Sequence, residues 1–184
     1  MDGTIRFQLL VSVPDMGDDN FDQTVVYIVE HNDEGALGIV LNRPSETPVS
    51  DHLPDLEGPV ISPPVFFVGG PVARGGLLAL GRRRLDAETV NAAPLAGPLA
   101  LVDPEALVNG DVHGLDALRL YTGYSGWGPG QLDAEVTAGA WHVVDAMPDD
   151  VLCAEPEALW RSVMRRQGGR LASQGLYPED PSVN

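Results

Sequence analysis

The sequence predicts an α+β domain built mainly from antiparallel strands. Short apolar runs rich in β-branched residues recur along the 184-residue chain and end near Gly, Pro, Asn or Asp, which is typical of strands. These runs follow one another with few helices between them, so neighbouring strands are expected to pair as hairpins. One amphipathic helix is predicted near the C-terminal end, at residues 156–167.

The first strands are predicted from two apolar runs and a hairpin pattern. Residues 7–13 are almost entirely apolar, and residues 24–29 are β-branched and aromatic. The polar segment 31–35 then leads into another apolar run at residues 36–41, and this order predicts a β-hairpin. Residues 45–64 contain several prolines and acidic residues, so a loop with one helical turn is expected there.

A second hairpin is predicted from the apolar runs at residues 65–68 and 77–80, which glycine-containing turns separate. A helical turn is expected near Asp86. Asp103 before Pro104 supplies an N-cap and a first-turn proline for a short helix. The remaining predicted strands are residues 99–102, 118–121, 141–145 and 151–153.

The glycine-rich segment at residues 123–130 is predicted to be a loop that leads into a helix at residues 131–137. Because Pro129 fixes its own φ, a neighbouring glycine is expected to have a positive φ. An alanine at Gly126 or Gly130 is therefore expected to destabilise the fold by about 1–3 kcal/mol.

The C-terminal helix carries one apolar stripe and has arginines in its last turn. Trp160 belongs to this stripe and is expected to lie in the core. Residues 1–184 are expected to form a single domain with a frayed tail over residues 177–184.

The charge of the chain limits its partners. There are 27 acidic residues against 11 basic ones, all of them Arg, which gives a net charge of -16. Such a field repels nucleic-acid phosphates and anionic membranes, so neither is an expected partner. Two arginine groups, residues 82–84 and residues 161–170, are compatible with an anionic partner, although solvated surface charge is the favoured interpretation. Without a basic N-terminal region or a long apolar run, the chain is expected to be soluble and cytoplasmic.

Motifs for common chemistries are incomplete in this sequence. Ser125 follows a predicted strand, but Trp127 stands where the nucleophile elbow of hydrolases requires Gly. The glycines at positions 70 and 75 have P-loop spacing, yet the chain contains no Lys. The four His residues lack ligand spacing, the acidic group at residues 15–22 lacks the order of a calcium loop, and Cys153 lies in an apolar stretch. We therefore expect no metal and no cofactor.

Several spaced motifs resemble the AlgH/YqgE-like family of bacterial proteins, and together they span most of the chain. They are Pro14-x-Met16-x-Asp18-x-x-Phe21, Thr24-Val25-Val26-Tyr27, Glu30-His31-x-x-x-Gly35-Ala36-x-Gly38, Asn42-Arg43-Pro44, Gly69-Gly70-Pro71-Val72, the block from Gly123 to Leu132, Trp141 and Trp160. The sequence departs from the family at Asp133, where Glu is common, and at Cys153, where an aromatic residue is common.

The resemblance implies an α+β fold in which a mainly antiparallel, split sheet curls into a pseudo-barrel with flanking helices. It does not imply a defined reaction. Family members are often described as transcriptional regulators. Because the charge of this chain opposes DNA contact, a regulatory role is expected to run through a protein partner or a small ligand.

We expect a non-enzymatic binding or regulatory protein whose ligand site forms where four segments converge. The expected site residues are His31, Asn42, Arg43, Gly69, Gly70, Gly126, Trp127, Gly128 and Gln131. Glycines permit close backbone approach and Trp127 offers a stacking face, but the same residues also suit the closed end of a crowded barrel. The alternative is an enzyme acting on a small polar substrate, in which Glu30, His31 or Asn42 is the acid, base or orienting group beside the Gly-Trp-Gly segment.

Overall fold

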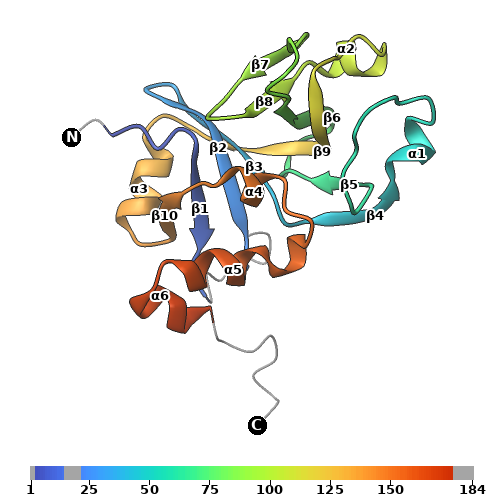
Figure 1. Ribbon diagram of the computed structural model, residues 1–184. Coiled ribbons are helices and arrows are strands. Elements are labelled where there is room, and N and C mark those ends of the chain that lie inside the picture. Colours follow the sequence, from blue (N-terminus) through green and yellow to red (C-terminus); the bar gives the residue numbers. More distant parts are fainter. Residues whose placement is uncertain (1–2, 15–21, 176–184) are drawn as a thin grey trace.

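The computed structural model describes residues 3–14 and 22–175 of the chain. Its strands form one strongly curled, mainly antiparallel sheet with helices around its outside, which is the predicted split pseudo-barrel (Figure 1). No helix in the described part is long and apolar enough to cross a membrane. The expected tail at residues 177–184 and most of the acidic group at residues 15–22 lie outside the described residues.

The strands of the sheet are numbered along the chain. They are β1 (Gln8–Ser12), β2 (Val25–Asn32), β3 (Gly35–Val40), β4 (Pro44–Pro48), β5 (Val65–Val68), β6 (Val72–Arg83), β7 (Ala92–Pro94), β8 (Leu99–Val102), β9 (Leu115–Trp127) and β10 (Trp141–Asp145). The helices are α1 (Val49–His52), α2 (Pro104–Val108), α3 (Gln131–Thr137), α4 (Pro148–Val151), the 3-10 turn η1 (Pro156–Ala158), α5 (Leu159–Arg166) and α6 (Gly169–Gln174).

The long strand β9 joins the two halves of the sheet. The hydrogen-bonded order is β10-β1-β2-β3-β9-β6-β8-β7, and β5 adds to β9 in parallel while also pairing with β4. The C-terminal end of β9 pairs with β3, whereas its remainder pairs mainly with β6. A change of partner along one strand is what curls and splits the sheet.

Several local predictions are confirmed. β2 and β3 form the predicted hairpin, with Asn32 opposite Gly35. Asp103 Oδ1 accepts a hydrogen bond from the Ala106 amide at 2.9 Å and so caps α2. Helix α3 has the predicted bounds, and Gly130 before it has a φ of 68°. These features depend on residues close together in the chain, which is why sequence patterns predict them.

Four predictions are wrong. β5 pairs with β4 and β9 and does not form a hairpin with β6. Residues 123–127 are not a loop, because β3 and β6 supply hydrogen-bond partners that extend β9 to Trp127. Residues near Asp86 form a turn, and residues 151–153 end helix α4 instead of forming a strand. The structure also adds β4, β7, α4 and α6, which the sequence patterns did not predict.

The core contains the predicted face of the C-terminal helix. Trp160 is buried, and its indole Nε1 donates to the Ser12 carbonyl oxygen at 3.0 Å. Val163 and Met164 on the same helix are fully buried. Figure 1 shows α5 and α6 together below the strands, so α5 closes one end of the curled sheet.

Candidate functional site

A polar hollow of about 660 Å³ lies beside the end of the β2–β3 hairpin. Its walls come from residues 3–5, from the hairpin turn and from helix α3. The ionisable groups among its described lining residues are His31, Asp33 and Asp133. The lining therefore offers mainly hydrogen-bond acceptors and negative charge, which favour a ligand with donors or positive charge.

Both ring nitrogens of His31 have partners. Nδ1 accepts a hydrogen bond from the Ile5 amide at 3.1 Å, which places the ring proton on Nε2. Nε2 lies 3.6 Å from Asp133 Oδ2. The imidazole thus links the N-terminal segment to α3 and presents no unshared lone pair to a substrate, which weakens its case as a general base.

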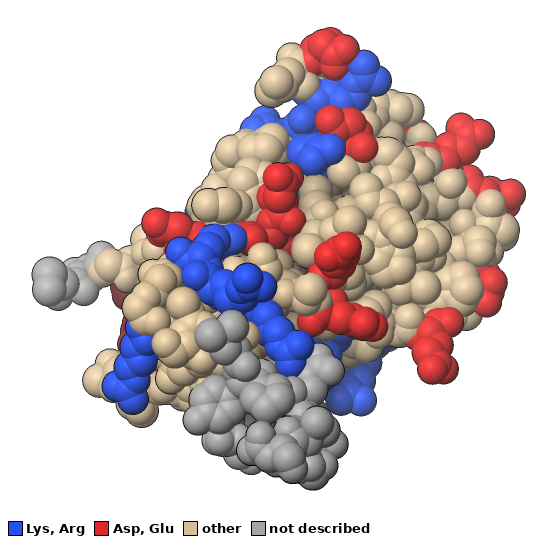
Figure 2. All heavy atoms as spheres, turned by 60° about the horizontal axis from the view of Figure 1, so that its bottom comes forward, with Lys and Arg blue, Asp and Glu red and all other residues tan. Residues whose placement is uncertain are grey.

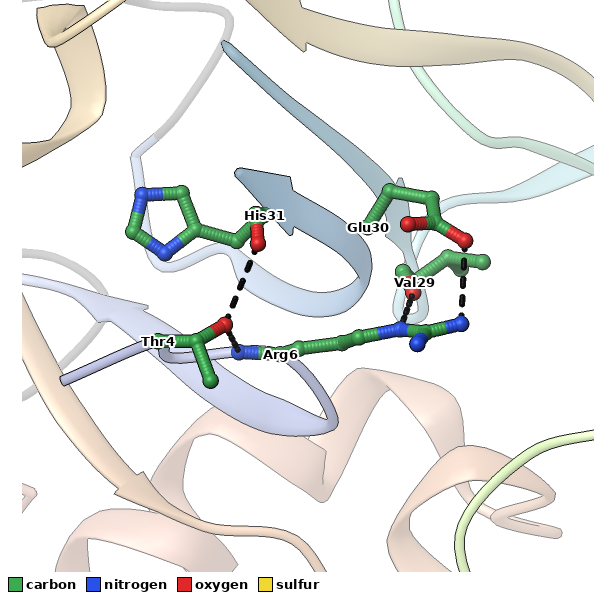
Figure 3. Close-up of polar contacts among 5 residues, drawn as sticks. All are labelled: Thr4, Arg6, Val29, Glu30 and His31. Carbon is green, nitrogen blue, oxygen red and sulfur yellow. Dashed lines mark hydrogen bonds and ion pairs between the residues drawn. The ribbon is translucent and has the colours of Figure 1, made fainter. Parts of the chain in front are cut away.

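Glu30 belongs to a separate contact on the other side of the strand. Arg6 Nη2 lies 2.9 Å from Glu30 Oε1, and Arg6 Nε donates to the Val29 carbonyl oxygen at 2.9 Å. Figure 3 shows the Glu30 carboxylate and the His31 ring pointing apart, with Arg6 reaching the former. Glu30 and His31 therefore do not form one acid-base pair.

Asn42 and Arg43 lie at the opposite end of the hairpin. Asn42 Oδ1 accepts from the Val25 amide at 3.0 Å, while Arg43 Nη2 donates to Thr24 Oγ1 at 2.8 Å. Val25 and His31 are separated along β2 by roughly 20 Å at the usual rise of a strand. The structure does not bring Asn42 and Arg43 to His31.

Gly69 and Gly70 pass directly against β9. A Cβ on Gly69 would lie 2.3 Å from the Gly123 carbonyl oxygen, and one on Gly70 would lie 2.2 Å from the Tyr124 carbonyl carbon. The Gly69 amide donates to Thr122, and its carbonyl accepts from Val40. These glycines are required because the connection between β5 and β6 passes close to the backbone of β9.

Trp127 and Gln131 are held in a network centred on Glu135. Trp127 Nε1 and Trp141 Nε1 each donate to Glu135 Oε2 at 2.9 Å. Gln131 Nε2 donates to Glu135 Oε1 at 2.9 Å, and its Oε1 accepts from the Gly128 amide at 3.1 Å. Trp127 is buried edge-on against Trp141, so it does not offer the expected stacking face. Only the i, i+4 spacing of Gln131 and Glu135 signals this network in the sequence.

Gly126 and Ser125 lie on the same stretch of chain. Gly126 is exposed and lies opposite Leu37 of β3. The Ser125 side chain is buried, and its Oγ lies 3.4 Å from the Gly69 carbonyl oxygen. Ser125 is therefore not presented to solvent as a nucleophile. In the described residues no group of three or more His, Cys, Asp or Glu is arranged to hold a metal ion.

Comparison with known sequences identifies close relatives. The AlgH-like family matches residues 9–172. A UPF0301 protein from Streptomyces avermitilis is 44% identical in an alignment that covers 96% of this chain and 94% of the relative. A UPF0301 protein from Mycobacterium leprae is 41% identical, with 96% and 89% of the two chains covered.

Solved structures give the same result. A crystal structure of a protein from Corynebacterium diphtheriae superposes with a TM-score of 0.87 at 27% identity, covering 96% of this chain and 94% of that one. The solution structure of AlgH from Pseudomonas aeruginosa gives a TM-score of 0.70 at 30% identity, covering 98% and 97%. The chain therefore belongs to the AlgH-like family.

Proposed function

We propose that this protein is a non-enzymatic binding or regulatory protein that acts through a small ligand or a protein partner, without direct contact with DNA. The polar hollow beside His31 carries this proposal. The hollow is open to solvent, and it is lined by His31, which belongs to the motif from Glu30 to Gly38. Its lining combines a fixed imidazole with the carboxylates of Asp33 and Asp133. A small ligand carrying an amine complements that lining.

The positions of the residues named for the enzyme alternative also favour a binding function over catalysis. His31 is engaged at both nitrogens, Glu30 is paired with Arg6, and Asn42 lies at the far end of the hairpin. An acid-base reaction needs such groups within reach of one substrate atom. On the face that Figure 2 shows, basic side chains lie in separate groups, intermixed with acidic ones, and this does not suit an extended contact of that face with a phosphate backbone.

An NMR titration tests this proposal. We expect ethanolamine and putrescine to shift the amides of residues 3–5, 31–33 and 130–137 in a saturable way, and ethylene glycol to leave them unchanged. Asp133→Asn should weaken the effect. Asp55→Asn is the matched control, because Asp55 is exposed and does not line the hollow. Equal weakening by both variants, or turnover of a small polar substrate that His31→Ala abolishes, would count against a binding function.

A further inference from the structure

A second hollow, of about 790 Å³, lies between the end of β6, the turn that follows it and strand β7. Arg82, Arg83 and Arg84 all line it, in a chain that has 11 basic residues and a net charge of -16. The other lining residues are largely apolar or small: Leu85, Ala87, Thr89, Ala92, Pro94, Gly97 and Pro98, together with Asp116. This arginine hollow shares no lining residue with the polar hollow beside His31.

A β-bulge in the partner strand β9 lies beside the arginines at the end of β6. Successive side chains of a regular strand point to opposite faces. Here the register between β6 and β9 shifts, so that Arg82 lies opposite Ala117 and Arg83 lies opposite Leu115. Asp116 is the extra residue on β9, and such a bulge redirects side chains locally.

The three arginines differ in their partners. Arg82 Nε lies 2.6 Å from Asp116 Oδ1, and Arg84 makes two contacts with Asp86, at 2.9 and 2.8 Å. Arg83 donates from Nη2 to the Gly97 carbonyl oxygen at 2.6 Å and has no carboxylate partner in the part of the chain that the structure describes. Its Nε is buried without an acceptor. Arg83 is therefore a guanidinium with no ion-pair partner of its own in this part of the chain.

We propose that the arginine hollow binds a small organic anion, with a carboxylate or phosphate group paired to Arg83 and an apolar body against Leu85 and Pro94. A guanidinium presents parallel N–H groups that match two anionic oxygens. Leu85 is fully exposed at 101% of its reference area, so an apolar ligand group would shield it. The hollow has the size of a small-molecule site.

The acidity of the whole chain does not prevent this binding. Charges more than about 8 Å from the ligand are largely screened at physiological ionic strength, whereas Arg83 would contact the anion at hydrogen-bond distance. Two ligand sources share the proposed chemistry, an organic carboxylate and a phosphate monoester. Benzoate and phenyl phosphate represent them, benzyl alcohol is the neutral counterpart, and inorganic phosphate lacks the apolar body.

The experiment is an NMR titration of the full chain that follows the Arg Nε–Hε signals and the amides of residues 82–98. We expect benzoate or phenyl phosphate to shift the Arg83 signal in a saturable way, and whichever binds more tightly identifies the anionic group. Benzyl alcohol should have no effect. Inorganic phosphate should bind more weakly than the better aromatic anion, and Leu85→Ser should remove that difference.

Matched variants distinguish binding at a specific site from general charge attraction. Arg83→Gln should lower the affinity roughly tenfold, while Arg83→Lys, which keeps the charge but loses the planar group, should lower it less. Arg74→Gln removes the same charge from an exposed arginine that does not line the hollow, so it should change the affinity by less than about threefold. Equal losses for Arg83→Gln and Arg74→Gln in folded variants, or no saturable shift with either aromatic anion, would overturn the proposal.

Discussion

Arg119 Nη1 donates to the Cys153 carbonyl oxygen at 2.6 Å, which ties the middle of β9 to the segment before the C-terminal helix. The same guanidinium donates from Nη2 to the Ser62 carbonyl oxygen at 2.7 Å and lies over the Phe67 ring at 4.3 Å. Arg119 is fully buried, its Nε has no partner among the described residues, and burial lowers its pKa. A desolvated cation held by carbonyl oxygens and an aromatic ring thus joins three distant segments.

Replacement of Arg119 should therefore destabilise the fold in a graded way. We expect Arg119→Ala to lower the free energy of unfolding by about 3–5 kcal/mol, because it opens a cavity and removes the donors to the Cys153 and Ser62 carbonyl oxygens. Arg119→Met fills the space without burying a charge, so it should cost about 1–2 kcal/mol. Urea denaturation of both variants measures the difference. If both variants lost the same free energy of unfolding, packing of the Arg119 side chain would not contribute to stability.

Glu135 should be more important for stability than its half-exposed position suggests. Glu135→Leu removes the described acceptor of Trp127 Nε1 and Trp141 Nε1, and we expect it to cost about 2–4 kcal/mol. Glu135→Gln retains one oxygen and should cost about 1 kcal/mol. Glu57→Leu, at an exposed loop position, is the control and should change stability by less than about 0.5 kcal/mol. Tryptophan fluorescence during urea denaturation reports on all three variants.

The glycines around β9 should differ sharply in their tolerance of alanine. Gly70 has a φ of 153° and no room for a Cβ, so Gly70→Ala should cost about 3 kcal/mol or more. Gly130 has a φ of 68° in open space, which predicts about 1–2 kcal/mol from backbone strain alone. At Gly126 the nearest atom to an added Cβ is 3.5 Å away, so Gly126→Ala should be nearly neutral.

This order differs from the expectation that an alanine at either Gly126 or Gly130 costs about 1–3 kcal/mol. The reason is that Gly126 lies in the extended part of β9, whereas Gly130 turns the chain into α3. Thermal and urea denaturation of the three alanine variants would measure the order, and a destabilised Gly126→Ala would contradict the geometry.

Stability should fall in alkaline solution because of Tyr27. Burial raises the pKa of the Tyr27 hydroxyl from 10.0 to about 12, against smaller opposing effects of the Ala96 backbone and Arg6. The folded state thus keeps the proton to higher pH than the unfolded state. This contribution to stability is complete below pH 10.0 and is lost as the pH rises toward about 12.

Urea denaturation between about pH 9 and pH 12 measures this loss. Tyr27→Phe removes the titrating group and should make stability less dependent on pH in that range. Tyr121 is also buried with a raised pKa, so part of the dependence should remain. Tyr124→Phe is the control. If Tyr124→Phe reduced the pH dependence of stability as much as Tyr27→Phe does, the dependence could not be assigned to Tyr27.

Duplex DNA should not bind appreciably at about 150 mM salt, because the net charge of -16 opposes the phosphates. Electrophoretic mobility shifts over a range of salt concentrations test this expectation. A mobility shift at submicromolar protein concentration that weakens as salt is added would contradict this expectation. It would also contradict the proposal that the protein acts without direct contact with DNA.

Much of the fold was predictable because its signals are local. Two apolar runs separated by a polar turn mark β2 and β3, Asp103 and Pro104 mark the start of α2, and the stripe containing Trp160 marks the buried face of α5. The candidate site was only partly predictable. His31 was identified, but its partners Ile5 and Asp133 come from segments far away in the chain.

The sequence by itself determined the family, the α+β class, the acidic surface and the local elements, since each depends on composition or on neighbours a few residues apart. Only the tertiary structure decided that β5 joins β9, that residues 123–127 continue β9 as a strand, and that Gly70 passes against Tyr124. It also decided that consecutive arginines line one hollow. The physical reason is that strand pairing and burial depend on which distant backbone groups satisfy one another once the sheet has curled.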